Sequence, residues 1–228
     1  MIQENLTRVY RRIEQAAVRS GRDPATVRLV AVSKTVSAER IAEAITCGVR
    51  LLGENYIQEA HQKIVALDAG QAAWHFIGHL QTNKARFAVE LFELIHSVDS
   101  LKLARALDKQ ARQLNKVQSI LVQVNLAGEA TKSGIGTAEA PRLIRDMSRC
   151  SNLAIKGLMT MPPFFNAPEK VRPYFKALRQ LAERITAMNI QGVTMAELSM
   201  GMTGDFEVAV EEGATLVRIG TAIFGERQ

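Results

Sequence analysis

Short runs of apolar and β-branched residues alternate with longer amphipathic stretches along this chain. Eight such runs have the length and the bounding glycine or polar residues that are typical of strands. They cover residues 28–33, 49–53, 74–78, 94–98, 119–124, 153–157, 194–199 and 215–219. Between them, apolar residues recur at helical spacing in the segments 6–17, 41–45, 103–114, 144–147, 178–188 and 205–212.

Helical segments thus follow most of the predicted strands, and one extra helix precedes the first strand. Ser37 and Asp99 are placed to cap two of these helices, and Thr137 with Pro141 opens a third. Eight strand–helix units match a closed (β/α)8 barrel more closely than an open doubly wound sheet, which remains the alternative. We predict the α/β class, with a single barrel domain over residues 1–228 and the extra helix covering the bottom of the barrel.

Composition narrows the class of protein. Cys47 and Cys150 are the only cysteines and lie far apart, which argues for a reducing compartment and against a disulfide framework. No apolar run approaches the roughly 20 residues of a membrane span, and the polar N-terminus lacks a signal-peptide core. A net charge of +6 with 5% aromatic residues is a weak signal for nucleic acid. We expect a cytoplasmic monomer without nucleic-acid or membrane partners.

The residues just after each strand are informative, because barrel sites lie where the strands end. Lys34 ends the first strand and shares the parity of Val30 and Val32, so it enters the top of the barrel if those two valines point inward. Desolvation there would favour a neutral amine that attacks a carbonyl. The alternative is a strand-end lysine that reaches solvent.

Two glycine-rich loops follow the seventh and eighth strands, at residues 199–204 and 220–225. Barrels often bind phosphate at this place, although such glycines also simply turn the chain. Arg218 has the parity of Leu216 and is expected to point inward, either toward a pyridine nitrogen or toward a buried carboxylate. A lysine for an aldehyde, a phosphate cup and a cation for a ring nitrogen together indicate a pyridoxal 5′-phosphate (PLP) site.

Seven segments resemble, in order, the pyridoxal phosphate homeostasis protein family, also called proline synthase co-transcribed homologues. They are residues 30–34, 53–59, 74–84, 132–134, 157–161, 198–203 and 217–225. The resemblance implies an alanine-racemase-like barrel of PLP fold-type III. It further implies a protein that holds PLP as a lysine aldimine and buffers or supplies it in vitamin B6 homeostasis, without robust catalysis. PLP-dependent acceptor enzymes are the implied partners.

Carried over residue by residue, the resemblance puts the Schiff base on Lys34, Asn55 near the ring and Arg218 beside the pyridine nitrogen. It puts the phosphate against Ser199, Gly201, Gly220 and Thr221. This chain departs from the family at His79, where proline is usual, and at Thr203, where serine is usual. Both departures lie in loops and could tune access to the site.

Other candidate residues give weaker evidence for a functional role. His75 and His79 straddle a strand end without a carboxylate or thiol to complete a metal set, so we predict no metal site. Glu54 and Glu59 are either acid–base groups or a solvated helix start. Lys132 is either a second amine or a solvated loop lysine.

Two enzymatic functions are alternatives to a protein that only holds and supplies PLP. A PLP-dependent amino-acid racemase needs two bases, one on each face of the substrate carbon. Racemases of this fold take a tyrosine from an additional C-terminal domain of the partner subunit, whereas this sequence stops at Gln228, and only Tyr56 follows a strand end. A Schiff-base aldolase would use Lys34 directly and would not need Arg218.

Overall fold

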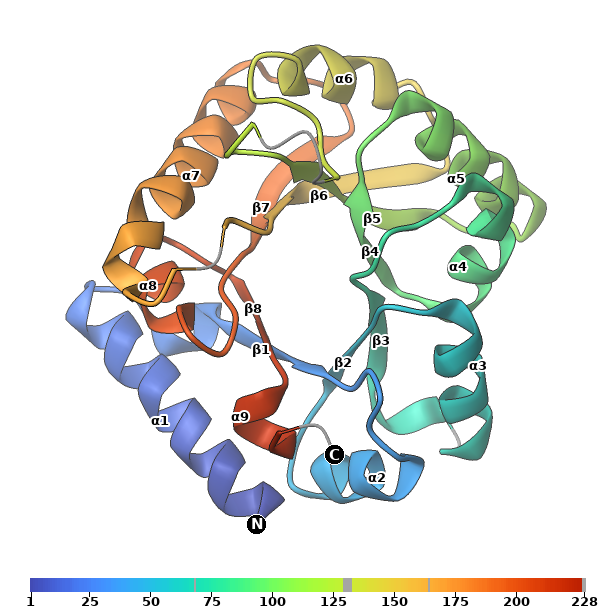
Figure 1. Ribbon diagram of the computed structural model, residues 1–228. Helices are drawn as coiled ribbons and strands as arrows, with labels where there is room; N and C mark the ends of the chain where they lie inside the picture. The colour runs from blue at the N-terminus through green and yellow to red at the C-terminus, as the bar shows by residue number, and fades with distance from the viewer. Residues whose placement is uncertain (68, 129–132, 164, 227–228) are drawn as a thin grey trace.

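The computed structural model describes residues 1–67, 69–128, 133–163 and 165–226, and their strands close into one parallel barrel in the order β1 to β8 (Figure 1). The strands are β1 Arg28–Val32, β2 Leu51–Glu54, β3 Ala73–Phe76, β4 Leu94–Val98, β5 Gln118–Val124, β6 Leu153–Thr160, β7 Val193–Ser199 and β8 Leu216–Ile219. All eight predicted strands are confirmed. The alternative of an open sheet is wrong, because β8 pairs in parallel with β1.

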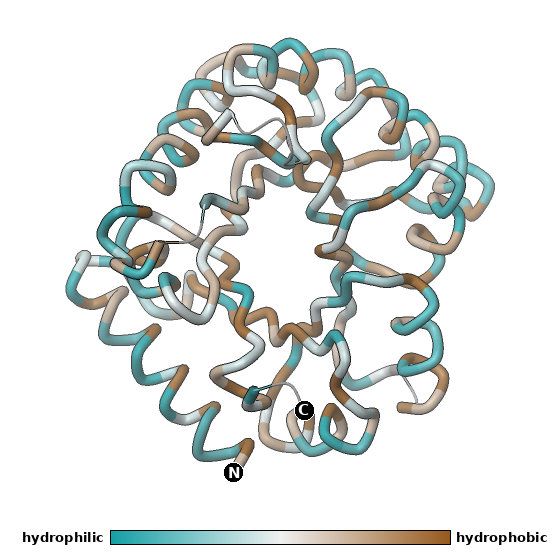
Figure 2. The backbone as a smooth tube through the Cα atoms, in the orientation of Figure 1, coloured by the Kyte–Doolittle hydropathy of each residue, from teal (hydrophilic) through white to brown (hydrophobic). Residues whose placement is uncertain are grey.

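Helices surround this barrel on the outside (Figure 1). They are α1 Ile2–Arg19, α2 Ala38–Thr46, α3 Ile57–Ala66, α4 Ala85–Leu91, α5 Leu101–Gln113, α6 Ala140–Met147, α7 Arg172–Ala187, α8 Phe206–Glu211 and α9 Thr221–Phe224. Hydrophilic and hydrophobic positions alternate along them (Figure 2), as expected for helices that bury one face. The amphipathic segments read from the sequence are therefore confirmed as helices.

The predicted helix starts are confirmed only in part. Ser37 precedes α2 as its N-cap residue. The prediction for Asp99 is wrong, because α5 begins after Ser100, whose hydroxyl accepts a hydrogen bond from the backbone amide three residues on. Pro141 lies in the first turn of α6, but that helix begins at the residue before it rather than near Thr137. Neighbouring polar residues compete for the cap, and geometry decides between them.

The prediction for the extra N-terminal helix is also wrong. α1 lies along the side of the barrel, where it packs against α8, α9 and α2 (Figure 1). Near its start, the Asn5 side-chain amide donates to the Ile223 carbonyl beyond the carboxyl end of β8, at 2.9 Å. Just after its end, Arg22 donates to the carbonyl of Ala214 below the amino end of β8. Because α9 has only four residues, α1 fills the groove that a full-length eighth helix would occupy.

Apolar side chains pack on both sides of the barrel wall. The larger cluster lies between strands and helices, and includes Leu29 and Ala31 of β1. A smaller cluster fills the interior and consists of Val30, Leu94, Leu121, Met159 and Leu216, with Leu51 packed against it. Since alternate strand residues face opposite sides, this cluster identifies the inward parity of each strand.

Candidate functional site

Buried polar residues, four of which contact one another, share the inward face of the barrel with the smaller apolar cluster. Arg218 pairs in register with Val30, His75 with Leu94, and Ser199 with Leu216. Register partners on neighbouring strands project to the same side, so these polar side chains point into the barrel. His96, the fourth, is fully buried on β4. The predicted inward direction of Arg218 is confirmed.

These four residues form a continuous hydrogen-bonded set, here called the interior polar chain. The Arg218 guanidinium donates to the Ser199 hydroxyl at 2.5 Å, and through its other terminal nitrogen to the Thr160 carbonyl at 2.8 Å. Ser199 Oγ lies 2.8 Å from His96 Nδ1, and His96 Nε2 lies 3.1 Å from His75 Nδ1. Arginine has only donors, so Ser199 must accept from it. The interior polar chain runs across the barrel from Arg218 on β8 to His75 on β3.

Arg218 is a buried cation whose hydrogen bonds go to neutral oxygens. It is 4% exposed. Burial lowers its pKa to about 10, partly offset by the charge of Asp205, so it stays protonated at neutral pH. The hydrogen bonds to Ser199 and Thr160 go to a hydroxyl and a carbonyl, not to the buried carboxylate that was the alternative. A buried charge whose hydrogen bonds go to neutral oxygens is costly, and this favours an electron-rich ligand beside it.

Burial keeps both histidines of the interior polar chain neutral. It lowers the pKa of His75 to about 4, with the charge of Arg28 as the second cause. It also lowers the pKa of His96 well below the ordinary value, aided by the charges of His75 and Arg218. The sequence analysis rejected metal binding by His75 but missed this contact. The inward parity of His75 and His96 was the available signal, since each lies two residues from another inward position.

Lys34 and Asn55 follow β1 and β2 at the mouth of the barrel. Val30 points inward, which confirms the condition under which Lys34 was expected to enter the barrel top. Lys34 is half-buried in the turn after β1. Asn55 is half-buried too, and its Oδ1 atom is buried with no hydrogen-bond partner among the described residues. An amide with unused hydrogen-bonding capacity at this place suits a polar ligand.

Close backbone packing explains why glycine occupies positions 201 and 220 in the two predicted phosphate loops. Gly201 has φ +90°, and a Cβ there would lie 2.5 Å from the Ala209 Cβ, so α8 packs against its bare backbone. A Cβ on Gly220 would lie 3.2 Å from the Val32 carbonyl oxygen, so the end of β8 packs closely against the end of β1. Thr221 is exposed and opens α9. A phosphate role for these residues stays a prediction.

A buried ionic cluster lies behind the Lys34 turn, on the helix side of the wall. Glu54 is fully buried, and its Oε1 accepts from Lys63 Nζ at 2.7 Å. Lys63 Nζ also donates to Glu59 Oε1 at 2.6 Å. Burial raises the pKa of Glu54, against the opposing effect of Lys63. The interpretation of Glu54 as part of a solvated helix start is therefore wrong, and sequence analysis did not single out Lys63.

The two departures from the family pattern lie at the rim. His79 is exposed, and its Nδ1 lies 3.2 Å from Ser133 Oγ in the loop after β5. Thr203 is half-buried between β7 and α8. Lys132, the proposed second amine, lies outside the described residues. The effect of both departures on access stays a prediction.

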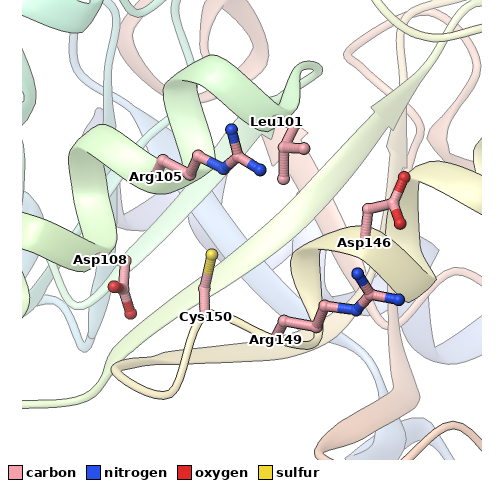
Figure 3. Close-up of a pocket in the computed structure, with 6 residues that line it drawn as sticks. All are labelled: Leu101, Arg105, Asp108, Asp146, Arg149 and Cys150. Atoms are coloured by element: carbon pink, nitrogen blue, oxygen red, sulfur yellow. The ribbon is translucent and has the colours of Figure 1, made fainter.

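A separate pocket lies between α5 and α6. Figure 3 shows its lining: Leu101, Arg105, Asp108, Asp146, Arg149 and Cys150. It contains neither Lys34 nor Arg218.

Across the described residues, no group of three or more histidine, cysteine or acidic side chains is arranged to hold a metal ion. In the same part of the chain, no helix is both long and apolar enough to cross a membrane.

Comparison with known proteins agrees with this geometry. Residues 4–228 match the model of the alanine racemase N-terminal domain family. The pyridoxal phosphate homeostasis protein of Aquifex aeolicus is 45% identical over 225 residues, covering 99% of this chain and 98% of that protein. The chain belongs to the pyridoxal phosphate homeostasis protein family.

Two solved structures show how closely members of this fold agree. A protein of Bifidobacterium adolescentis described as unknown superposes with a TM-score of 0.92 and 36% identity, covering 98% of this chain and 94% of that chain. PipY from Synechococcus elongatus PCC7942, solved with PLP bound, superposes with a TM-score of 0.85 and 37% identity, covering 99% and 100%. The barrel and its (β/α)8 topology are thus confirmed by the relatives.

Proposed function

We propose that this protein binds PLP at the carboxyl end of its barrel and acts in PLP homeostasis. Lys34 supplies the amine for a covalent bond to the aldehyde, and Arg218 faces the pyridine nitrogen. Asn55 lies near the ring, and the phosphate is held by Ser199, Gly201, Gly220 and Thr221. The observation that carries this proposal is Arg218, a buried inward cation with neutral hydrogen-bond partners, in a chain 37% identical to PipY, which was solved with PLP.

The donor set fits the chemistry of this cofactor. PLP supplies an electrophilic aldehyde, a ring nitrogen with a lone pair and a dianionic phosphate. Arg218 is protonated at neutral pH, so it would donate to the ring nitrogen and keep that nitrogen unprotonated. The Oδ1 atom of Asn55, which has no hydrogen-bond partner among the described residues, supplies a further acceptor at the mouth. The loops after β7 and β8 offer backbone amides and the hydroxyl of Thr221 to an anion.

The proposed role is a carrier and buffer, with the barrel as one binding domain. An unprotonated ring nitrogen makes the cofactor a weaker electron sink, which disfavours abstraction of an amino-acid Cα proton. The interior histidines are neutral and bonded within the interior polar chain, which positions Arg218 instead of presenting a base at the mouth. PLP-dependent acceptor enzymes would receive the cofactor from a monomer in the cytoplasm.

The match to the alanine racemase N-terminal domain family keeps racemisation as a second candidate. A racemase needs a second base opposite Lys34. Tyr56, which follows β2, is the tyrosine that the sequence placed nearest the site, and it is 62% exposed. This observation favours the carrier over the racemase.

Incubation with amino acids in deuterated water distinguishes the two roles. The PLP-loaded protein is expected to exchange the Cα proton of L-amino acids no faster than free PLP at the same concentration. The measurement is loss of the Cα proton signal by NMR over a panel of L-amino acids. Turnover at enzyme-like rates, on the order of 1 s⁻¹ or more, would replace the carrier proposal with the racemase.

A further inference from the structure

Lys34 lies in a short turn whose two flanking residues are both held by one buried cluster. Lys63 Nζ donates to the Ser33 carbonyl at 2.6 Å, on one side of Lys34. Glu59 Oε1 accepts from the Thr35 backbone amide, on the other side. The same Glu59 oxygen accepts from Lys63 Nζ, so the two contacts are joined. The backbone on both sides of Lys34 is thereby tied to helix α3.

All three hydrogen-bond donors of the Lys63 ammonium, at the centre of the cluster, are used. An ammonium has three donors, and those of Lys63 go to the Ser33 carbonyl, Glu54 Oε1 and Glu59 Oε1. Glu54 Oε1 also accepts from the Ser33 hydroxyl at 2.7 Å. Lys63 is 7% exposed, while Glu54 and Ser33 are fully buried. Low dielectric strengthens such contacts, so they hold the turn in one geometry.

The turn is also strained at the residue next to Lys34. Thr35 has φ +62°, in the left-handed region that a β-branched residue rarely adopts. Such a conformation costs free energy and persists only where its surroundings impose it. Here the Glu59 carboxylate receives the Thr35 amide, and the Ser33 carbonyl receives Val36 N at 3.0 Å as well as Lys63. The cluster therefore imposes the backbone direction from which the Lys34 side chain departs.

We propose that Lys63, with Glu54 and Glu59, is a positioning group that fixes the Ser33–Thr35 turn so that the Lys34 amine meets the aldehyde of the bound cofactor. This inference rests on the proposed function. It assigns no contact with the ligand to Lys63, which lies on the helix side of the barrel wall. Its consequence is selective: losing the cluster should impair bond formation by Lys34 and spare the contacts made by Arg218 and the phosphate loops.

The test compares two ligands on the full-length chain. PLP has the aldehyde, whereas pyridoxine 5′-phosphate has the same ring and phosphate with an alcohol in its place. Lys63→Met keeps the length of the side chain and removes the ammonium. We expect Lys63→Met to slow covalent trapping of PLP by borohydride about tenfold or more, because misplacing a reacting group by about 1 Å can cost 10²-fold. Affinity for pyridoxine 5′-phosphate should stay within about twofold of wild type.

Lys116→Met is the matched control. Lys116 is half-buried and lies in the loop between α5 and β5, at the opposite end of the barrel. Its ammonium donates to the Val89 carbonyl on α4. It therefore removes a comparable lysine-to-backbone contact far from Lys34. Its trapping rate should equal that of the wild type. Slowing in this variant as large as in Lys63→Met would overturn the proposal.

Glu59 gives a second test if Lys63→Met fails to fold. Glu59→Gln keeps an oxygen for the Thr35 amide, whereas Glu59→Ala removes it. We expect trapping to be slowed in Glu59→Ala and largely restored in Glu59→Gln. Parallel loss of both ligands, or unchanged trapping in Glu59→Ala, would refute a positioning role. Wild-type protein that binds neither ligand would instead refute the proposed function itself.

Discussion

Lys34→Ala is expected to abolish the covalent bond to PLP while leaving a weaker, reversible affinity. The variant loses the amine, but the Arg218 and phosphate contacts are separate from it. Affinity should fall to that for pyridoxine 5′-phosphate, a loss of roughly 100-fold or about 3 kcal/mol. Equilibrium dialysis gives the affinity, and the near-visible absorbance of the lysine-linked cofactor reports the bond.

Lys84→Ala is the control for this experiment. Lys84 closes the short helical turn after β3, at the same end of the barrel, and its ammonium lies 6.0 Å from the Phe87 ring centre. Removing it should leave the absorbance intact. Thr221→Val should weaken binding without changing the absorbance, since it touches only the phosphate loop. Retention of the lysine-linked absorbance in Lys34→Ala would place the bond elsewhere.

Acidification is expected to destabilise the ligand-free protein through the interior polar chain. The pKa of His75 is about 4 in the folded barrel, against 6.5 for an unperturbed histidine. Between these values the unfolded chain binds the extra proton, so the free energy of unfolding falls as pH falls from 6.5 toward 4. The difference corresponds to about 3 kcal/mol from His75 alone. His96, whose pKa is lowered in the same direction, adds to it.

Urea unfolding at a series of pH values measures this effect. His75→Asn keeps an acceptor near the position of Nδ1 and removes the titrating ring. Its stability should depend less on pH over this window than that of the wild type, even if it is lower throughout. His61→Asn alters an exposed histidine on α3 and should follow the wild-type curve. An unchanged slope in His75→Asn would show that His75 does not carry the acid sensitivity.

Strand positions and inward parities were predictable because they depend on local composition and on the two-residue period of a strand. Leu216 is an apolar residue of inward parity, so the direction of Arg218 followed from it by counting. Val30 is also inward, but Lys34 lies in the turn beyond β1, and its entry into the barrel stays a prediction. The extra helix was misplaced for a different reason. α1 lies along the side of the barrel because α9 has only four residues. The hydrophobic pattern within α1 contains no information about the length of α9.

Contacts between distant strands could not be read from the sequence. Ser199 and His96 are 103 residues apart, and they meet because the closed barrel brings β7 and β4 within reach across its interior. The contacts of Lys63, on the helix side of the barrel wall, could not be predicted for the same reason. Its position on an amphipathic helix is typical of a solvated lysine, and only the packing of α3 against β2 and the turn after β1 reveals a buried ammonium beside Lys34.

Reductive trapping tests the central claim most directly. The wild-type protein is incubated with PLP, reduced with borohydride, digested and analysed by mass spectrometry. The account predicts one dominant phosphopyridoxyl adduct, located on Lys34, that pyridoxine 5′-phosphate does not produce. A dominant adduct on another lysine, or no adduct above that formed with urea-unfolded protein, would contradict it.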